Sequence, residues 1–218
     1  MALIKLGIDI VLHLDRYLGQ IISTYGVITY ALLFVVIFVE TGLVVTPFLP
    51  GDSLLFAAGA FAAIGSLNIF VLLLILAGAA VLGDTANYWI GHFFGQKMIE
   101  NPKMPIKKEH IEKTQAFFAK YGGKTIIMAR FVPVVRTFAP FVAGVGKMSY
   151  GRFISYNLIG GVAWVLVGTT TGYFFGNIPW VKNNFSVVIL AIVFISVLPM
   201  VIPYLMAKIK HDKNLAKD

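Results

Sequence analysis

An eighty-residue stretch that carries almost no charge is the feature that most limits how this chain can fold. Between Tyr17 and Gln96 only three side chains are charged, and all three are acidic: Glu40, Asp52 and Asp84. Of the 218 residues in the chain, 58% are hydrophobic and 13% are charged. Soluble domains average about 45–50% apolar and about 25% charged residues. The composition therefore predicts an all-α polytopic membrane protein with one membrane domain and no separate soluble domain.

The positive charge of the chain is gathered into two lysine clusters beside apolar segments. Seven lysines lie between Lys97 and Lys124, four lie between Lys208 and Lys217, and the net charge is +8. Such clusters act as topology signals and as contacts for anionic lipid head groups, so we expect no nucleic-acid partner. The chain has no cysteine, which excludes disulfides, thiolate nucleophiles and cysteine-ligated metals. We expect no metal and no organic cofactor.

Apolar stretches divide the chain into predicted spans and interrupted segments. Stretches long enough to cross a bilayer fall at roughly residues 22–40, 67–95, 153–176 and 184–207. Two further apolar stretches, about 41–66 and 125–147, carry helix breakers, which are Pro47, Pro50 and Gly51 in the first and Pro133 and Pro140 in the second. We predict a re-entrant helical hairpin at each, because irregular backbone inside a bilayer must be shielded from lipid.

The lysine clusters also predict how these segments are oriented. Loops rich in lysine and arginine face the cytoplasm, which places residues 96–124 and the tail 208–218 there. Counting the spans then makes the second hairpin begin and end inside, the first begin and end outside, and both termini cytoplasmic. Residues 1–20 are amphipathic and are expected on the membrane surface, which leaves 21–207 as the membrane domain.

Hairpins that enter from opposite faces are typical of one class of membrane protein. Inverted-repeat transporters are built in this way and bind their substrate near the middle of the membrane. A short internal echo agrees with two repeats, because the sequence GHFFG at 91–95 recurs as GYFFG at 172–176. The predicted architecture is about four spans and two oppositely oriented re-entrant hairpins.

Two arginines inside the second interrupted stretch are the first candidate site residues. Ionisable side chains at this depth cost about 2.5–3.5 kcal/mol each on insertion scales, so they are kept for function or paired. Arg130 and Arg136 flank Pro133, whose bend would let both guanidinium groups converge on one phosphate. Two alternatives stay open: Arg130 extends to the interface, or both arginines are structural ion-pair partners of Glu40 and Asp52.

The acidic residues are the second set of candidates. Glu40 and Asp52 lie in a low-dielectric setting, where a carboxyl group can exchange a proton in each transport cycle. Asp52 in PGDSLLF also fits the capping position of a helix. Asp84 is expected to pair within the bundle, with Asn87 as one candidate partner, and Asn157 is a secondary candidate. Trp164 is expected at the interface or in packing.

Several motifs resemble those of the DedA family of bacterial inner-membrane proteins, in the SNARE-associated/VTT superfamily. They are ETGLVVTPFLPGDSLLFAAGA, GDTANYWIGHFFG and GGKTIIMARFVPVVRTFAPFVAG, and the resemblance covers roughly residues 25–205. It implies two opposed re-entrant hairpins and roles in envelope homeostasis and proton-motive-force maintenance. It also implies, in some members, transport of undecaprenyl phosphate or of phospholipids. The family's essential acidic pair falls on Glu40 and Asp52, and its essential arginines fall on Arg130 and Arg136.

The leading functional hypothesis is a flippase for a phosphate-bearing lipid, whose partners are membrane lipids and protons. Alternatives are a phospholipid scramblase and a proton-dependent ion antiporter. A lipid phosphatase would need a nucleophile and a histidine general acid in the pocket, and no histidine follows Arg136 in its apolar segment. We therefore expect no enzymatic activity. A scaffold for other envelope proteins would not need buried charges, and homo-oligomer formation is left open.

Overall fold

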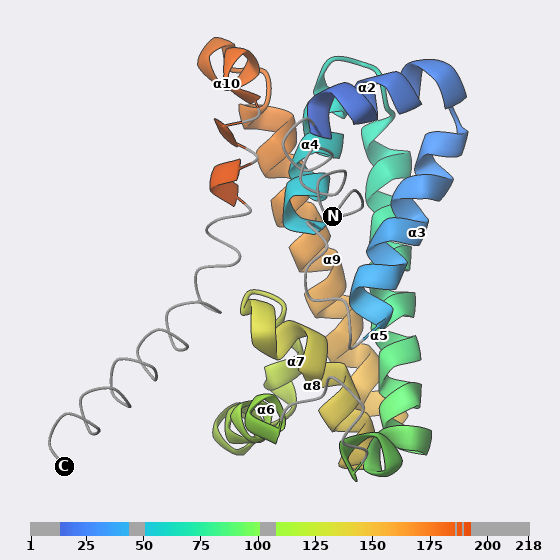
Figure 1. Cartoon of the computed structure of the whole chain (residues 1–218), viewed down its shortest axis with the longest axis vertical. Helices are drawn as coiled ribbons and strands as arrows, with labels where there is room; N and C mark the ends of the chain where they lie inside the picture. Colours follow the sequence, from blue (N-terminus) through green and yellow to red (C-terminus); the bar gives the residue numbers. More distant parts are fainter. Residues whose placement is uncertain (1–13, 44–50, 101–107, 186, 189, 193–218) are drawn as a thin grey trace, which may run out of the picture.

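The long apolar helices of the protein agree with a membrane location. The computed structural model describes residues 14–43, 51–100, 108–185, 187–188 and 190–192, and this part of the chain contains helices and no β-strand. Two helices are long and apolar enough to cross a membrane: α5 (Ile69–Glu100), over Ile69–Gly95, and α9 (Tyr150–Phe175) (Figure 1). They confirm the predicted all-α class and the predicted spans 67–95 and 153–176. The predicted span 184–207 and the tail lie mostly outside the described residues.

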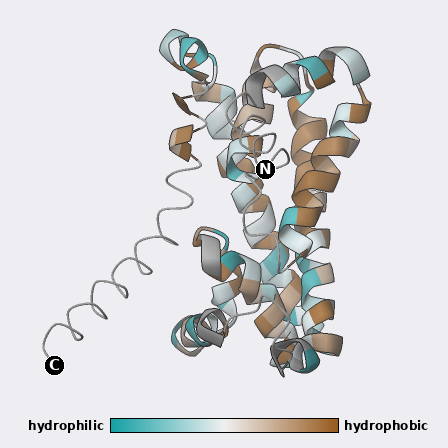
Figure 2. Ribbon diagram, in the orientation of Figure 1, coloured by the Kyte–Doolittle hydropathy of each residue, from teal (hydrophilic) through white to brown (hydrophobic). Residues whose placement is uncertain are grey.

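The outer surfaces of these two helices carry large hydrophobic side chains. Phe70 and Leu74 on α5 and Phe174 on α9 are each more than two-thirds exposed. In Figure 2 the hydrophobic colour follows α3 and the adjoining part of α5, whereas α6 and α10 carry hydrophilic residues. Exposed apolar side chains at this density are expected where lipid tails replace water.

In the first part of the chain, two short helices, α3 and α4, form a pair that runs into the bundle and back to the same end. Helix α2 (Leu14–Tyr25) is followed by α3 (Ile28–Gly42) and α4 (Gly51–Ala63). At the start of α3, the Tyr30 hydroxyl accepts a hydrogen bond of 2.6 Å from the backbone of Asn68, just before α5. At its end, Gly42 packs against Gly83, near the middle of α5. Helix α3 therefore runs along only half of α5.

The predicted first span at 22–40 is not one continuous helix. Gly26 has a positive φ of 50° and separates α2 from α3, so the apolar run is two helices. The 15 residues of α3 extend about 22 Å at 1.5 Å per residue, short of the roughly 30 Å hydrocarbon core. The first pair of short apolar helices is thus α3 and α4. Pro47 and Pro50 lie outside the described residues.

A second short helical pair stands at the opposite end of the bundle. Helix α6 (Lys108–Tyr121) and the 3₁₀ turn η1 (Gly122–Lys124) lead into α7 (Thr125–Ala129) and α8 (Pro133–Val145). Pro133 begins α8, a position that tolerates its missing N–H. Pro140 lies inside α8 without ending it, contrary to its expected role as a breaker. The pair lies within the predicted range 125–147, and in Figure 1 it faces the α3–α4 pair.

The second helix of each short pair, α4 or α8, is called its short arm, and it packs on the long helix of the other half of the chain. Helix α4 packs along α9, and α8 packs along α5. Gly172 of GYFFG leaves no room for a Cβ beside the Phe56 carbonyl, and Gly91 of GHFFG leaves none beside the Phe141 carbonyl. The sequence echo therefore marks equivalent helix crossings in two repeats, α2–α5 and α6–α9.

The two repeats run in opposite directions. Gly176, just after α9, contacts Ala60 near the end of α4, so α9 ends where α5 begins. Helices α2 and α10 (Pro179–Asn183) therefore lie at one end of the bundle, and α6 lies at the other.

Candidate functional site

The candidate site lies where the inner ends of the two helical pairs meet. Glu40 is in the last turn of α3, Asp52 is in the first turn of α4, and Arg136 is in the first turn of α8. Arg136 Nη2 lies 2.5 Å from Glu40 Oε1, and its Nη1 lies 3.1 Å from Asp52 Oδ1. A single guanidinium group therefore joins both arms of the first pair to the second pair.

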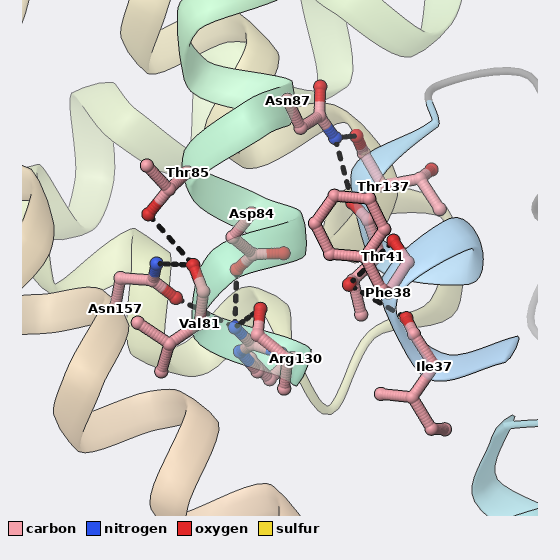
Figure 3. A network of polar contacts seen from close by, with 11 residues as sticks. Ile37, Phe38, Thr41, Val81, Asp84, Thr85, Asn87, Arg130, Thr137 and Asn157 are labelled. Carbon is pink, nitrogen blue, oxygen red and sulfur yellow. Dashed lines mark hydrogen bonds and ion pairs between the residues drawn. The ribbon is translucent and has the colours of Figure 1, made fainter. Parts of the chain in front are cut away.

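Arg130 is held by a different set of partners, which Figure 3 shows. Its Nη2 atom donates to Asp84 Oδ2 at 2.5 Å, to Asn157 Oδ1 at 2.7 Å and to the Ala80 carbonyl at 3.2 Å. The Asn157 amide in turn donates to the Val81 carbonyl at 3.0 Å. Asp84 and Asn157, the secondary candidates, thus anchor Arg130 to both long helices.

Asn87 connects the two helical pairs through backbone carbonyls. Its side-chain amide donates to Thr41 O at 3.2 Å and to Thr137 O at 2.9 Å (Figure 3). The expected contact between Asn87 and Asp84 is replaced by the Arg130 ion pair. Asn87 is fully buried, so it fixes the position of both inner ends relative to α5.

Trp164 is a site residue that sequence reasoning missed. Its indole N–H donates to Asp52 Oδ1 at 2.7 Å. The guanidinium carbons of Arg130 and Arg136 lie 5.7 Å and 5.1 Å from the centre of its ring, within cation–π range. Its position near the middle of a predicted span could have pointed to a role in the site. Membrane tryptophans concentrate at the interfaces, so one at mid-span is unusual.

Gly51 has a steric role at the site. A Cβ placed on Gly51 would overlap the Glu40 carboxylate, so only glycine lets the start of α4 approach this acid. Asp52 follows directly and sits at the N-terminal end of α4, where the helix dipole favours a carboxylate. It therefore serves both as a helix-end residue and as a partner of Arg136. Its side chain is 30% exposed, compared with 1% for Glu40.

The charges of the cluster do not balance. Three carboxylates (Glu40, Asp52 and Asp84) face two guanidinium groups, so the fully ionised cluster carries one excess negative charge. Among the described residues, no hydrogen-bond partner exists for Nε or Nη1 of Arg130, although both atoms are buried. Buried polar groups are normally satisfied, and these two donors are available to a further acceptor. Among the described residues, no three His, Asp or Glu side chains are placed so that they could hold one metal ion together.

The fold and the site define a class: a polytopic helical protein with a buried ionic cluster. The comparisons with known proteins identify the family within that class. The VTT-domain family model matches residues 49–174. The chain belongs to the DedA family of membrane proteins, of which the VTT domain is the common unit. No solved structure matches the chain.

Three relatives of the chain span most or all of its length, and two of them are named as membrane proteins. Protein DedA of Escherichia coli K12 is 52% identical over 220 residues, which cover 100% of this chain and 99% of that protein. An uncharacterised membrane protein of Mycobacterium leprae is 44% identical over 169 residues, covering 77% and 76%. Inner membrane protein YqjA of E. coli K12 is 35% identical over 151 residues, covering 69% of each chain.

Proposed function

We propose that this protein is a transporter that moves a phosphate-bearing lipid, with undecaprenyl phosphate as the favoured substrate, across a bacterial inner membrane. The observation that carries the proposal is the buried cluster in which Arg136 joins the inner ends of two opposed helical pairs. A site held between two movable halves is the design expected of alternating access.

The proposal includes a placement of the helices in the membrane. Helices α5 and α9 cross it, and the α3–α4 and α7–α8 pairs are re-entrant hairpins from opposite faces. The lysine-rich α6 end faces the cytoplasm by the positive-inside rule. Helices α2 and α10 then face the other side, and both termini, predicted to be cytoplasmic, lie outside the described residues.

The free donors of Arg130 and the charge excess suggest how a phosphate would bind. A phosphate oxygen can accept a hydrogen bond from Nε or from Nη1 of Arg130, the two atoms without a described partner. Adding an anion to a buried cluster that is already negative is costly, because unpaired buried charge is strongly disfavoured. Uptake of protons by Glu40 or Asp52 removes this cost and frees Arg136. Lipid binding and proton binding are therefore linked.

The same geometry is the basis for preferring a transporter over an enzyme. The cluster is built from carboxylates, guanidinium groups, amides and one indole, and Arg136 already has two anionic partners. These groups can exchange ion pairs, but none is arranged as a nucleophile beside a base. A phospholipid as the substrate is the second candidate, because the same arginine donors would bind its phosphate.

The test is translocation of undecaprenyl phosphate in proteoliposomes, with and without a pH gradient. Wild-type protein should move the lipid, Arg136→Ala should lower the rate at least tenfold, and Lys120→Ala on the exposed surface of α6 should match wild type. A phospholipid probe that crosses in place of undecaprenyl phosphate would identify the second candidate. Failure of both lipids to cross, with ion flux intact, would replace the proposal with an ion antiporter.

A further inference from the structure

Two cavities lie at opposite ends of the bundle, away from the ionic cluster. The larger, of about 390 Å³, lies between α6, η1, the end of α8 and the start of α9. The smaller, of about 250 Å³, lies between the end of α4, the end of α9 and the α10 region. Small-ligand pockets usually measure about 300–1,000 Å³, so the larger cavity has room for part of a ligand.

The two cavities occupy equivalent places in the two repeats. Val145, in the wall of the larger cavity, packs on Gly95 of α5, and Ala60, in the wall of the smaller cavity, packs on Gly176 after α9. Gly95 and Gly176 are the last residues of GHFFG and GYFFG. The repeat therefore places one cavity at the outer end of each short arm, one on each side of the membrane.

Both cavities combine apolar walls with one cationic side chain. Ile111, Phe118 and Val142 line the larger cavity beside Arg152, and Phe61, Ile64 and Phe185 line the smaller one beside Lys182. Both cations are exposed, and neither forms an ion pair with a described acid. Among the described residues, no acidic side chain lines either cavity. Such a site is complementary to an amphiphile with a negatively charged head and an apolar tail.

We propose that these cavities are paired docking sites for an anionic lipid, one in each leaflet. Arg152 or Lys182 holds the phosphate, and the first methylene groups of the tail lie against the apolar walls. Each cavity wall continues along a short arm to the ionic cluster, along α8 to Arg136 and along α4 to Asp52. That the docked lipid is the cargo rests on the proposed function, whereas docking itself does not.

Photo-crosslinking tests the docking sites on the full-length protein in nanodiscs. The probe is phosphatidylglycerol with a photoreactive group near the top of one acyl chain, and a phosphatidylcholine probe of the same design is the zwitterionic control. Labelling of α6 and α8 peptides should fall roughly fivefold in Arg152→Gln, as one lost cation–phosphate contact predicts. Gln115→Trp, which fills the cavity from an exposed position, should lower it similarly, and Lys120→Gln should not.

The corresponding variants of the other cavity are Lys182→Gln and Ile64→Trp, read on peptides of α4 and α10. Equal labelling by both probes, or labelling unchanged in Arg152→Gln and Gln115→Trp, would overturn the docking proposal. Arg136→Ala separates the two proposals, because it should abolish translocation and keep the labelling. If wild type moves no lipid but is labelled as described, docking stands and the transport proposal fails.

Discussion

Trp164 donates its indole N–H to Asp52 Oδ1, the same oxygen atom that Arg136 Nη1 engages. The two bonds measure 2.7 Å and 3.1 Å. Two donors on one carboxylate oxygen make Asp52 the point where α9, α4 and α8 meet. Asp52 is also the most exposed acid of the three.

Trp164→Phe should therefore impair transport more than folding. Phenylalanine keeps an aromatic ring near both arginines but loses the N–H donor and part of the indole's volume, and hydrogen bonds to charged groups contribute about 1.5–3 kcal/mol. We expect a roughly tenfold lower translocation rate in proteoliposomes. Trp180→Phe, at a 64% exposed position, is the control. Equal rates for Trp164→Phe and wild type would remove Trp164 from the site.

Gly51→Ala should destabilise the protein, because the added Cβ would overlap the Glu40 carboxylate. Overpacking of this kind costs about 1–3 kcal/mol, which lowers the midpoint of thermal unfolding measured in detergent. Gly78→Ala is a matched control, since no atom lies within 4 Å of a Cβ at that position. It should leave stability unchanged or raise it, because alanine is the better helix former. A midpoint for Gly51→Ala equal to that of Gly78→Ala would contradict the close approach.

Arg130→Met should be strongly destabilising, because it leaves Asp84 buried without its cationic partner. Breaking a buried pair from one side costs about 3–5 kcal/mol. The double variant Arg130→Met/Asp84→Leu removes both charges and should recover most of the thermal stability. We expect translocation to stay lost in the double variant. Recovery of transport along with stability would show that the pair is purely structural and that Arg130 does not bind phosphate.

Binding of a phosphate-bearing lipid should strengthen as the pH falls. The cluster contains three carboxyl groups and two guanidinium groups, so it is already negative when fully ionised. A bound anion should therefore be accompanied by proton uptake. Uptake of one proton would raise the affinity up to tenfold per pH unit. Tryptophan fluorescence titrations from pH 8 to pH 6 measure this slope, and Glu40→Gln should flatten it. An affinity independent of pH in the wild type would mean that binding and protonation are not linked.

The sequence predicted the site better than it predicted the partners within it. Charges and helix breakers in apolar stretches singled out Glu40, Asp52, Arg130 and Arg136, and the structure places each of them in an ion pair between helices. The pairing of Arg130 with Asp84, 46 residues away, depends on how α7 lies against α5, and no local spacing encodes that. The mid-span position of Trp164 was visible, but its hydrogen bond to Asp52 depends on α4 packing against α9.

The fold was predictable where composition decides it and less so where one backbone angle does. Hydropathy located α5 and α9 because their apolar runs are long and continuous. Hydropathy also joined the end of α2 to α3 in one predicted span, because a single glycine such as Gly26 does not interrupt an apolar run. Its positive φ, which hydropathy does not register, separates the two helices. The predicted span 22–40 therefore runs across the break between α2 and α3.

The reciprocal packing of α4 on α9 and of α8 on α5 means that the two halves of the chain exchange arms. A fragment ending after α5 would contain α4 without the helix that covers it, and a fragment starting at α6 would leave α8 equally bare. The pieces would have to be made together, and they would fold as an antiparallel heterodimer. A single half-length chain able to insert in both orientations could build the same crossing twice, so this molecule has the geometry of a dual-topology homodimer fused into one polypeptide.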